Sequence, residues 1–170
     1  DEHCEVVPEA QVLTRVSYQE IMEMAHLGAK VIHPRAVEIA MEGQIPLAVK
    51  GLDGQGNGTL IGSYHTVTAD RVVTGITHLK GLAQFILRFN DEDLSLVVFQ
   101  RLGNAQISID LIQVNPGLIA FTVLQSAAEK ARNVLGDLPM EVEVRSGFAK
   151  VSAVGGGMRG VPGVMARVVA

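Results

Sequence analysis

The stretch that decides the fold is Leu82-Ala83-Gln84-Phe85-Ile86-Leu87-Arg88-Phe89. The apolar residues at positions 83, 85, 87 and 89 alternate with Gln84 and Arg88, which is the two-residue period of a strand with one buried face. A helix is predicted next, because the carboxylates of residues 91–93 suit a helix N-terminus and apolar residues then recur at helical spacing. Those apolar residues are Leu94, Val98 and Leu102. Gly103 and Asn104 predict the end of this helix.

Two more strands and a second helix follow. Residues 107–114 predict a strand with Ile107, Ile109 and Leu111 on one face. Asn115-Pro116-Gly117 is turn chemistry and predicts a hairpin with a strand over residues 118–124. Ser126 and Glu129 have capping-box spacing, a stripe of Ala127, Ala131, Val134 and Leu135 predicts a helix, and Gly136 predicts its end. Apolar and charged residues then alternate over 140–145, which predicts a last strand.

This order is strand, helix, strand, strand, helix, strand, and it puts both helices on one face of an antiparallel sheet. The fold class expected is therefore α+β, with a ferredoxin-like βαββαβ unit. At this compact length the unit resembles an ACT domain, a small regulatory module that binds amino acids. The order alone occurs in many ferredoxin-like domains with unrelated functions.

The composition argues against several classes of protein, including nucleic-acid-binding and membrane proteins. The 170 residues are 48% hydrophobic but only 4% aromatic, so the core is expected to be aliphatic. A net charge of −4 offers no basic surface for nucleic acid. No apolar run approaches the roughly 18 residues that span a bilayer. The lone Cys4 cannot form an internal disulfide, which fits a reducing cytoplasm. We expect a cytoplasmic protein with no metal site and no nucleic-acid or membrane partner.

The chain before this unit predicts a helical segment. The first sixteen residues carry little pattern and are expected to form an exposed lead-in. Ser17 and Glu20 predict a capping box for a helix closed by Gly28, and Pro34 suits the first turn of a second helix that Gly43 ends. Residues 45–49 predict a short strand.

The link between these helices, Gly28-Ala29-Lys30-Val31-Ile32-His33-Pro34-Arg35, allows two interpretations. Lys30 on a tight link could reach a phosphate, with His33 and Arg35 at a helix start. Alternatively Lys30 is solvated, His33 caps the second helix, and Arg35 pairs with Glu38 or Glu42.

Glycine-rich stretches flank the βαββαβ unit. Residues 51–58 contain four glycines and predict a surface loop; they lack the Lys and Ser/Thr pattern of a P-loop. Residues 71–77 predict a further strand that leads into the sheet, and residues 148–154 predict a new strand after it. Residues 155–160 then precede another helix start near Val164.

The link octapeptide, together with Ser17 to Ala25 before it and Ala36 to Ala40 after it, closely resembles the end of the kinase domain of aspartate kinases. The similarity continues through Ile45-Pro46-Leu47, Gly58-Thr59-Leu60-Ile61 and Val73 to His78, and then through Ala149 to Met158. It covers nearly the whole chain in the family's order. The regulatory part looks most like the diaminopimelate-inhibited isoform of Gram-positive bacteria.

This resemblance implies a domain organisation. Residues 1–70 would be the C-terminal part of an amino-acid-kinase α/β domain with a linker, residues 71–146 an ACT domain, and residues 147–170 the start of a second ACT domain that is cut off at Ala170. Aspartate kinases transfer a phosphoryl group from ATP to aspartate, with ATP and Mg²⁺ as cofactors. Their phosphate- and aspartate-binding half is not in this sequence, so the chain is expected to be inactive alone, with no catalytic residue and no cofactor of its own. Lys30 and Val31 match the position that contacts the nucleotide.

The resemblance also implies an effector site. Ser108, Ile109 and Asp110 match the effector-binding strand of lysine-sensitive relatives, and Asp110 could balance an ammonium group. The start of the predicted helix at Leu94 could offer backbone N–H groups to a carboxylate. The loop residues Asn90, Asp91, Leu94 and Ser95 complete the predicted site. Many relatives have Pro-Asp-x-Pro-Gly there, so the acids of this loop either attract the second ammonium of lysine or diaminopimelate or simply start the helix.

Two functions stay open at this point. The first is feedback control of an aspartate kinase by lysine, threonine or diaminopimelate. The second is a free-standing ACT module for amino-acid sensing or oligomerisation. In both cases the uncovered sheet face and edges predict at least a dimer formed through ACT domains.

Overall fold

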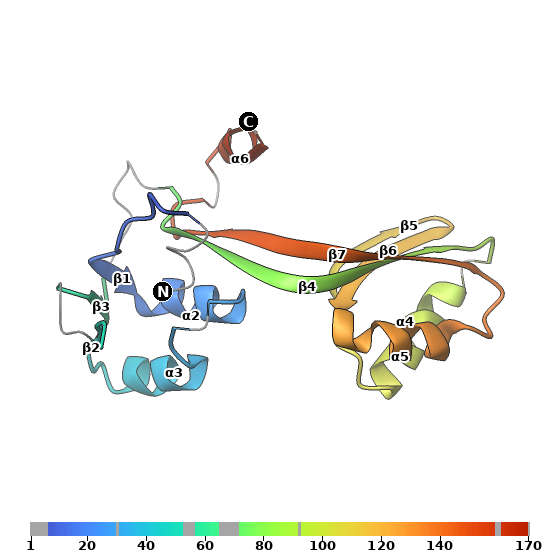
Figure 1. The fold of residues 1–170 in the computed structure, drawn as a ribbon, viewed down its shortest axis with the longest axis horizontal. Helices are drawn as coiled ribbons and strands as arrows, with labels where there is room; N and C mark the ends of the chain where they lie inside the picture. The colour runs from blue at the N-terminus through green and yellow to red at the C-terminus, as the bar shows by residue number, and fades with distance from the viewer. Residues whose placement is uncertain are drawn as a thin grey trace. The chain divides into compact units, whose positions relative to one another are not determined.

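The structure, a computed structural model, describes residues 7–29, 31–52, 57–64, 72–91, 93–158 and 161–169. The chain forms two compact units: unit 1 comprises residues 1–78 and 151–170, and unit 2 comprises residues 79–150. Two long strands, β4 (Gly75–Arg88) and β7 (Glu141–Val154), contribute residues to both units. Figure 1 labels these elements.

Unit 2 is a four-stranded sheet in the order β5-β6-β4-β7 with two helices on one side, as Figure 1 shows. Its elements besides β4 and β7 are α4 (Leu94–Asn104), β5 (Asp110–Asn115), β6 (Leu118–Leu124), the 3₁₀ turn η1 (Gln125–Ala127) and α5 (Ala128–Leu135). Strand β6 pairs antiparallel with both β4 and β5. The α+β class and the ferredoxin-like order predicted from the sequence are confirmed.

The core of unit 2 follows the alternation in the sequence. Residues 83, 85 and 87 of β4 and residues 119, 121 and 123 of β6 are buried against the helices. Phe85 and Phe121 are register partners whose ring centroids lie 5.3 Å apart in a stacked arrangement. The helices contribute their apolar stripes: Leu94, Val98, Leu102, Ala128, Ala131 and Leu135. Burying one such aliphatic or aromatic side chain is worth about 1.5–3 kcal/mol, so this layer stabilises the unit.

Unit 1 has a three-stranded sheet in the order β1-β3-β2. Its elements are β1 (Arg15–Ser17), α2 (Tyr18–His26), α3 (Pro34–Glu42), β2 (Leu47–Val49), β3 (Thr59–Gly62) and α6 (Val164–Val169). The prediction of an exposed lead-in before Ser17 is wrong at its end, because Arg15 and Val16 pair with β3 in parallel and Val16 is fully buried. A three-residue strand is too short to show alternation.

Helix α2 begins with the predicted capping box. The Ser17 hydroxyl accepts a hydrogen bond from the Glu20 N–H, and the Glu20 carboxylate accepts one from the Ser17 N–H. The same carboxylate is buried and also accepts from the Thr74 hydroxyl, at 2.5 Å. The Thr77 hydroxyl donates to the Leu27 carbonyl at the end of α2. Helix α2 is therefore tied at both ends to the segment that enters β4.

Two predicted strand boundaries are wrong. The sequence predicted separate strands over 71–77 and 83–89, and again over 140–145 and 148–154, but β4 and β7 each run without interruption. The two strands are hydrogen-bonded to each other. Gly81 and Gly147 have φ of 73° and 84°, a conformation that glycine adopts without strain. Each glycine lies in the gap between two predicted strands, and its positive φ is accommodated within one continuous strand.

Two further predictions in unit 2 are corrected. Strand β5 begins only at Asp110, and Leu111 is exposed instead of sharing a face with Ile107 and Ile109. A register shift lies between Asp110 and Gln113 and turns Leu111 away. The Ser126 capping box does not form, because the 3₁₀ turn η1 carries the chain into α5, whose N-cap is Ala127 with no side-chain hydrogen bond.

Candidate functional site

Asp110 is the first residue of β5 and lies opposite Thr122 of β6. The Thr122 hydroxyl donates to the Asp110 carbonyl at 3.1 Å, and Asp110 Oδ1 accepts from the Leu111 N–H at 2.8 Å. Leu111 has φ of 49°, a left-handed conformation that is uncommon for leucine. This local geometry orients the carboxylate, and its side chain stays 51% exposed.

The second oxygen of this carboxylate is bound by Lys150. Asp110 Oδ2 accepts a hydrogen bond from Lys150 Nζ, and the lysine side chain is only 11% exposed. The hydrogen bond from Lys150 lowers the pKa of the Asp110 carboxyl below its ordinary value, with a smaller contribution from the Leu111 N–H; partial burial acts in the opposite direction. Both oxygens of Asp110 are therefore held within the chain, although the group faces solvent.

This ion pair joins the two edge strands of the sheet. Asp110 lies on β5 and Lys150 lies on β7, with β6 and β4 between them in the strand order. The helix side of those strands is filled by the core, so the pair crosses the opposite face. On that face Leu82, Ala120 and Thr122 are buried although none of them belongs to the packed core. The open face is thus partly closed at the Asp110 end.

The loop before α4 lies at the other end of the sheet. Asn90 and Asp91 are exposed, Ser95 is half-buried, and Leu94 is buried in the core as the first residue of α4. Asp91 Oδ1 accepts from the Asp93 N–H at 3.1 Å, which is the simple helix-start role that the sequence left open. Glu92 lies outside the described residues.

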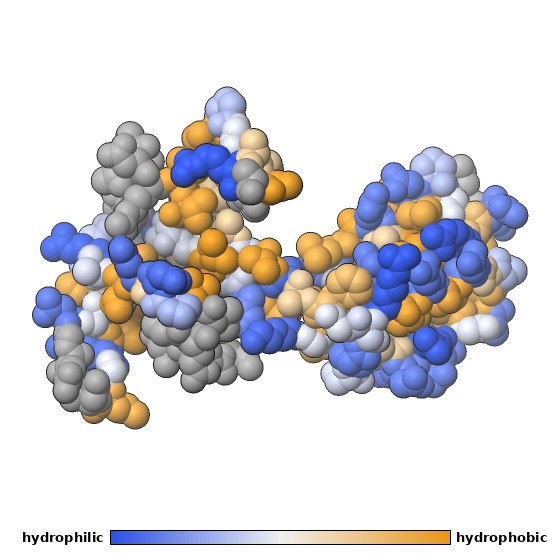
Figure 2. Space-filling view, turned by 45° about the horizontal axis from the view of Figure 1, so that its top comes forward, coloured by the Kyte–Doolittle hydropathy of each residue, from blue (hydrophilic) through white to orange (hydrophobic). Residues whose placement is uncertain are grey.

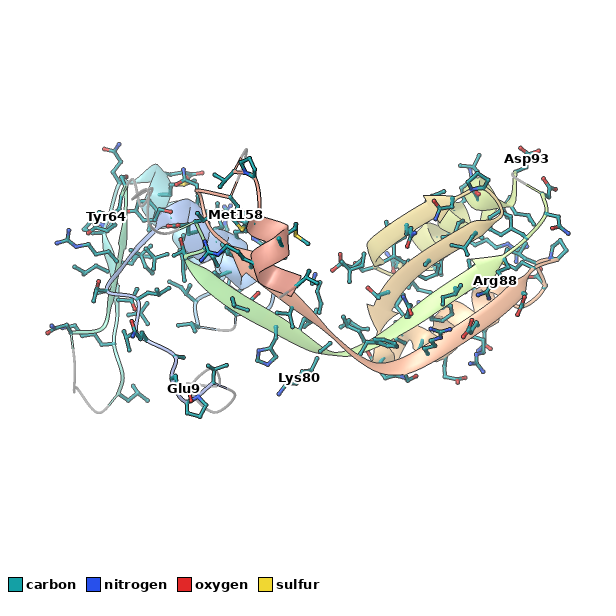
Figure 3. The ribbon with its side chains drawn as sticks, turned by 90° about the horizontal axis from the view of Figure 1, so that it is seen from above. Glu9, Tyr64, Lys80, Arg88, Asp93 and Met158 are labelled. Atoms are coloured by element: carbon teal, nitrogen blue, oxygen red, sulfur yellow. The ribbon has the colours of Figure 1, made fainter. Side chains whose placement is uncertain are left out.

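The strand register separates the two groups of predicted effector residues. Asp110 is opposite Thr122, and Thr122 is opposite Gln84, whereas the loop begins after Arg88. Four residues of strand span about 13 Å. In Figure 3, Asp93 lies beyond Arg88, and Lys80 lies toward the opposite end of the same strand. Within one chain, Ser108, Ile109 and Asp110 therefore do not meet Asn90, Asp91, Leu94 and Ser95.

Of the two predicted nucleotide contacts, the structure describes only Val31. Val31 is exposed, and Lys30 lies outside the described residues. His33 caps α3 by accepting from the Arg35 N–H, and Arg35 pairs with Glu38. These are the structural alternatives that the sequence had left open for His33 and Arg35.

Lys150 is the residue that sequence reasoning missed. Its charge and its place in a strand were visible, but a contact between residues 40 positions apart depends on the order of the strands across the sheet. Within the described parts of the chain, no group of His, Cys, Asp and Glu side chains could hold a metal ion. No helix in those parts is long and apolar enough to cross a membrane.

Comparisons with known proteins show what this chain is similar to. The family model of the amino acid kinase family matches residues 1–51. Aspartokinase 1 of Bacillus subtilis is 39% identical over 171 residues, which cover 96% of this chain and 42% of that protein. The chain thus spans less than half the length of this relative.

Solved structures extend the similarity. The regulatory subunit of aspartate kinase from Thermus thermophilus matches at 30% identity with a TM-score of 0.53, over 58% of this chain and 71% of that chain. E. coli aspartokinase III matches at 25% identity in two structures. Its complex with aspartate and ADP has a TM-score of 0.78, over 97% of this chain and 39% of that one. Its complex with lysine and aspartate has a TM-score of 0.68, over 89% and 36%.

Proposed function

Because this chain belongs to the aspartate kinase family, we propose that it binds an end-product amino acid for feedback control of an aspartate kinase. The chain carries a regulatory region of the ferredoxin-like ACT type. The observation that carries the proposal is the Asp110 carboxylate, which is oriented by its backbone contacts and half exposed on the open face of the sheet. Such a group suits the ammonium of an amino acid.

The catalytic part of the proposal concerns the whole enzyme. In this proposal residues 1–70 derive from the catalytic domain, residues 71–146 form the ACT domain and residues 147–170 begin a second one. The full enzyme would use ATP and Mg²⁺ to phosphorylate aspartate, with Lys30 and Val31 at the edge of the nucleotide pocket. We expect no phosphorylation of aspartate by this chain alone in a coupled ADP-release assay. Measurable turnover would contradict that expectation.

The identity of the effector is proposed only as a class. Lysine, threonine and diaminopimelate are the candidates, and the lysine complex of E. coli aspartokinase III supports an amino acid of this kind. Ser108, Ile109 and Asp110 are the proposed contacts in unit 2. Asn90, Asp91, Leu94 and Ser95 are proposed as contacts only where a second copy or a second ACT domain brings them to Asp110.

Calorimetric titration of the purified chain with each of the three amino acids tests the proposal. We expect saturable binding by at least one, and loss of that binding in Asp110→Ala. Absence of binding by all three, with folded protein shown by circular dichroism, would contradict an amino-acid site in this unit.

Pairing of two copies is a second candidate, and β5 is the observation that favours it. This edge strand is exposed along its whole length, including Leu111, Ile112 and Val114. Figure 2 shows apolar side chains reaching the surface of unit 2 between polar ones. An exposed edge strand with apolar side chains favours pairing with another strand. Sedimentation equilibrium should give a dimer that Val114→Lys shifts toward monomer; a monomeric wild-type chain at high concentration would contradict pairing.

A further inference from the structure

We propose that Lys150 binds the carboxylate of the same amino acid whose ammonium is held by Asp110, so that the ligand inserts into the Asp110–Lys150 ion pair. This inference rests on the proposed function, because it concerns the same site. It names a ligand-binding residue that lies on β7, outside the segments 90–95 and 108–110.

Charge balance favours a ligand that inserts between Asp110 and Lys150 over a ligand that displaces Lys150 from Asp110. A ligand that only took Asp110 from Lys150 would leave a lysine ammonium, on a side chain that is 11% exposed, without its anion. Leaving a charge of this kind unpaired is costly. An α-amino acid carries an ammonium group and a carboxylate on the same carbon. When it enters the pair, Asp110 gains the ligand ammonium and Lys150 gains the ligand carboxylate, so every charge keeps a partner.

The position of Lys150 makes it the suitable cation. The N-terminus of α4, which could also bind a carboxylate, lies at the far end of the sheet from Asp110 in the same chain. The other pairs of unit 2 are separate: Arg88 and Arg145 contact Glu143, and Arg101 contacts Asp137. Lys130 donates to the Ala105 carbonyl. Lys150 already has its ammonium at the Asp110 carboxylate, so it is the cation nearest to a ligand that inserts there.

The mode of binding also predicts what the site selects. A ligand needs an ammonium and a carboxylate close together, as an α-amino acid has, and an amine without a carboxylate gains nothing from Lys150. An amine would instead have to compete with Lys150 for Asp110. The ratio of the two affinities therefore measures the contribution of Lys150.

The experiment compares the tightest-binding of diaminopimelate, lysine and threonine with the corresponding amine that lacks every carboxylate. These partners are cadaverine for diaminopimelate and for lysine, and 1-amino-2-propanol for threonine. For the wild-type chain we expect the amino acid to bind about tenfold more tightly than its partner, as hydrogen bonds between charged groups allow. In Lys150→Met the ratio should fall to about one, because the amino acid binds more weakly and the amine does not.

Lys80→Met is the matched control, since Lys80 is an exposed lysine on the neighbouring strand β4 and the change in charge is the same. It should keep the wild-type ratio, and circular dichroism should show that both variants are folded. A Lys150→Met chain that keeps the wild-type ratio overturns the inference and leaves the proposed function standing. Absence of binding by all three amino acids to both the wild-type chain and Lys150→Met overturns both. The comparison of ligands on the wild-type chain needs no variant, and equal affinities there also overturn the inference.

Discussion

The two units each hold a carboxylate in place with several donors, but they do so in opposite ways. In unit 1, Glu20 is 4% exposed and accepts hydrogen bonds from uncharged groups of Ser17 and Thr74, at 3.1, 2.7 and 2.5 Å. In unit 2, Asp110 is half exposed and is held by the Leu111 N–H and the charged Lys150. The first arrangement fixes two segments together inside unit 1, whereas the second leaves the carboxylate open to solvent.

The two carboxylates differ in this way because Asp110 is exposed to solvent and Glu20 is not. A buried carboxylate has no water to replace a lost donor, so each neutral hydrogen bond to Glu20 matters for stability. The Asp110 carboxylate is reached by water, which weakens its ion pair, so a ligand that gives both Asp110 and Lys150 a new partner can enter there. Burial therefore predicts that variants at Glu20 change the stability of unit 1, while variants at Asp110 change binding more than stability.

Glu20→Ala tests the first half of this contrast and should have the largest effect. Loss of the carboxylate leaves the Ser17 and Thr74 donors without their acceptor, and we expect unit 1 to lose about 3 kcal/mol of its free energy of unfolding. Urea unfolding followed by NMR signals from each unit separately measures this. Glu23→Ala, at an exposed position of the same helix, is the control and should change stability by less than about 0.5 kcal/mol. Equal losses of stability in Glu20→Ala and Glu23→Ala would contradict the stabilising role of the buried carboxylate.

Thr74→Val removes one donor and keeps the shape of the side chain. We expect a loss of about 1.5 kcal/mol in unit 1, because a hydrogen bond to a charged acceptor is stronger than one between neutral groups. A double-mutant cycle with Glu20→Ala should show that the two losses are not additive. Additive losses would mean that this hydrogen bond does not couple helix α2 to the segment before β4.

Asp110→Asn sharpens the second half of the contrast. The side chain is half exposed, so its pair with Lys150 should stabilise unit 2 by at most about 1 kcal/mol. Because the native pKa is lowered from 3.8, this contribution is present above that pH and is lost as the pH falls through the lowered native value. Unfolding of unit 2 measured between pH 7 and pH 2 should therefore show a smaller acid-induced loss in Asp110→Asn than in the wild-type chain. An identical pH dependence would mean that Lys150 does not hold Asp110 in solution.

Local patterns in the sequence predicted most of the elements. The alternation in β4, the Ser17 capping box and the Gly136 end of α5 all depend on residues within a few positions of each other, and all appear in the structure. Asp110 was predicted as an effector contact from the resemblance to a family, because the spacing of hydrophobic residues does not single it out.

The features that sequence reasoning missed depend on distant residues. The merging of two predicted strands in β4 and again in β7 accompanies the pairing of β4 with β7, which lie far apart in the sequence. The Asp110–Lys150 contact requires the order of all the strands in the sheet. No window of neighbouring residues contains that information.

The last prediction concerns the two capping-box signatures, and Ser126 is the position where we expect the smallest effect. Ser17 and Ser126 are each followed by glutamate three residues later, but only Ser17 caps a helix. Ser17→Ala should cost unit 1 about 1–2 kcal/mol, since it removes the cap and a donor to Glu20. Ser126→Ala should change unit 2 by less than about 0.5 kcal/mol, because α5 begins after a 3₁₀ turn and has no side-chain cap to lose. The same unfolding measurements compare the two variants. A loss at Ser126 as large as that at Ser17 would mean that Ser126 caps a helix in solution.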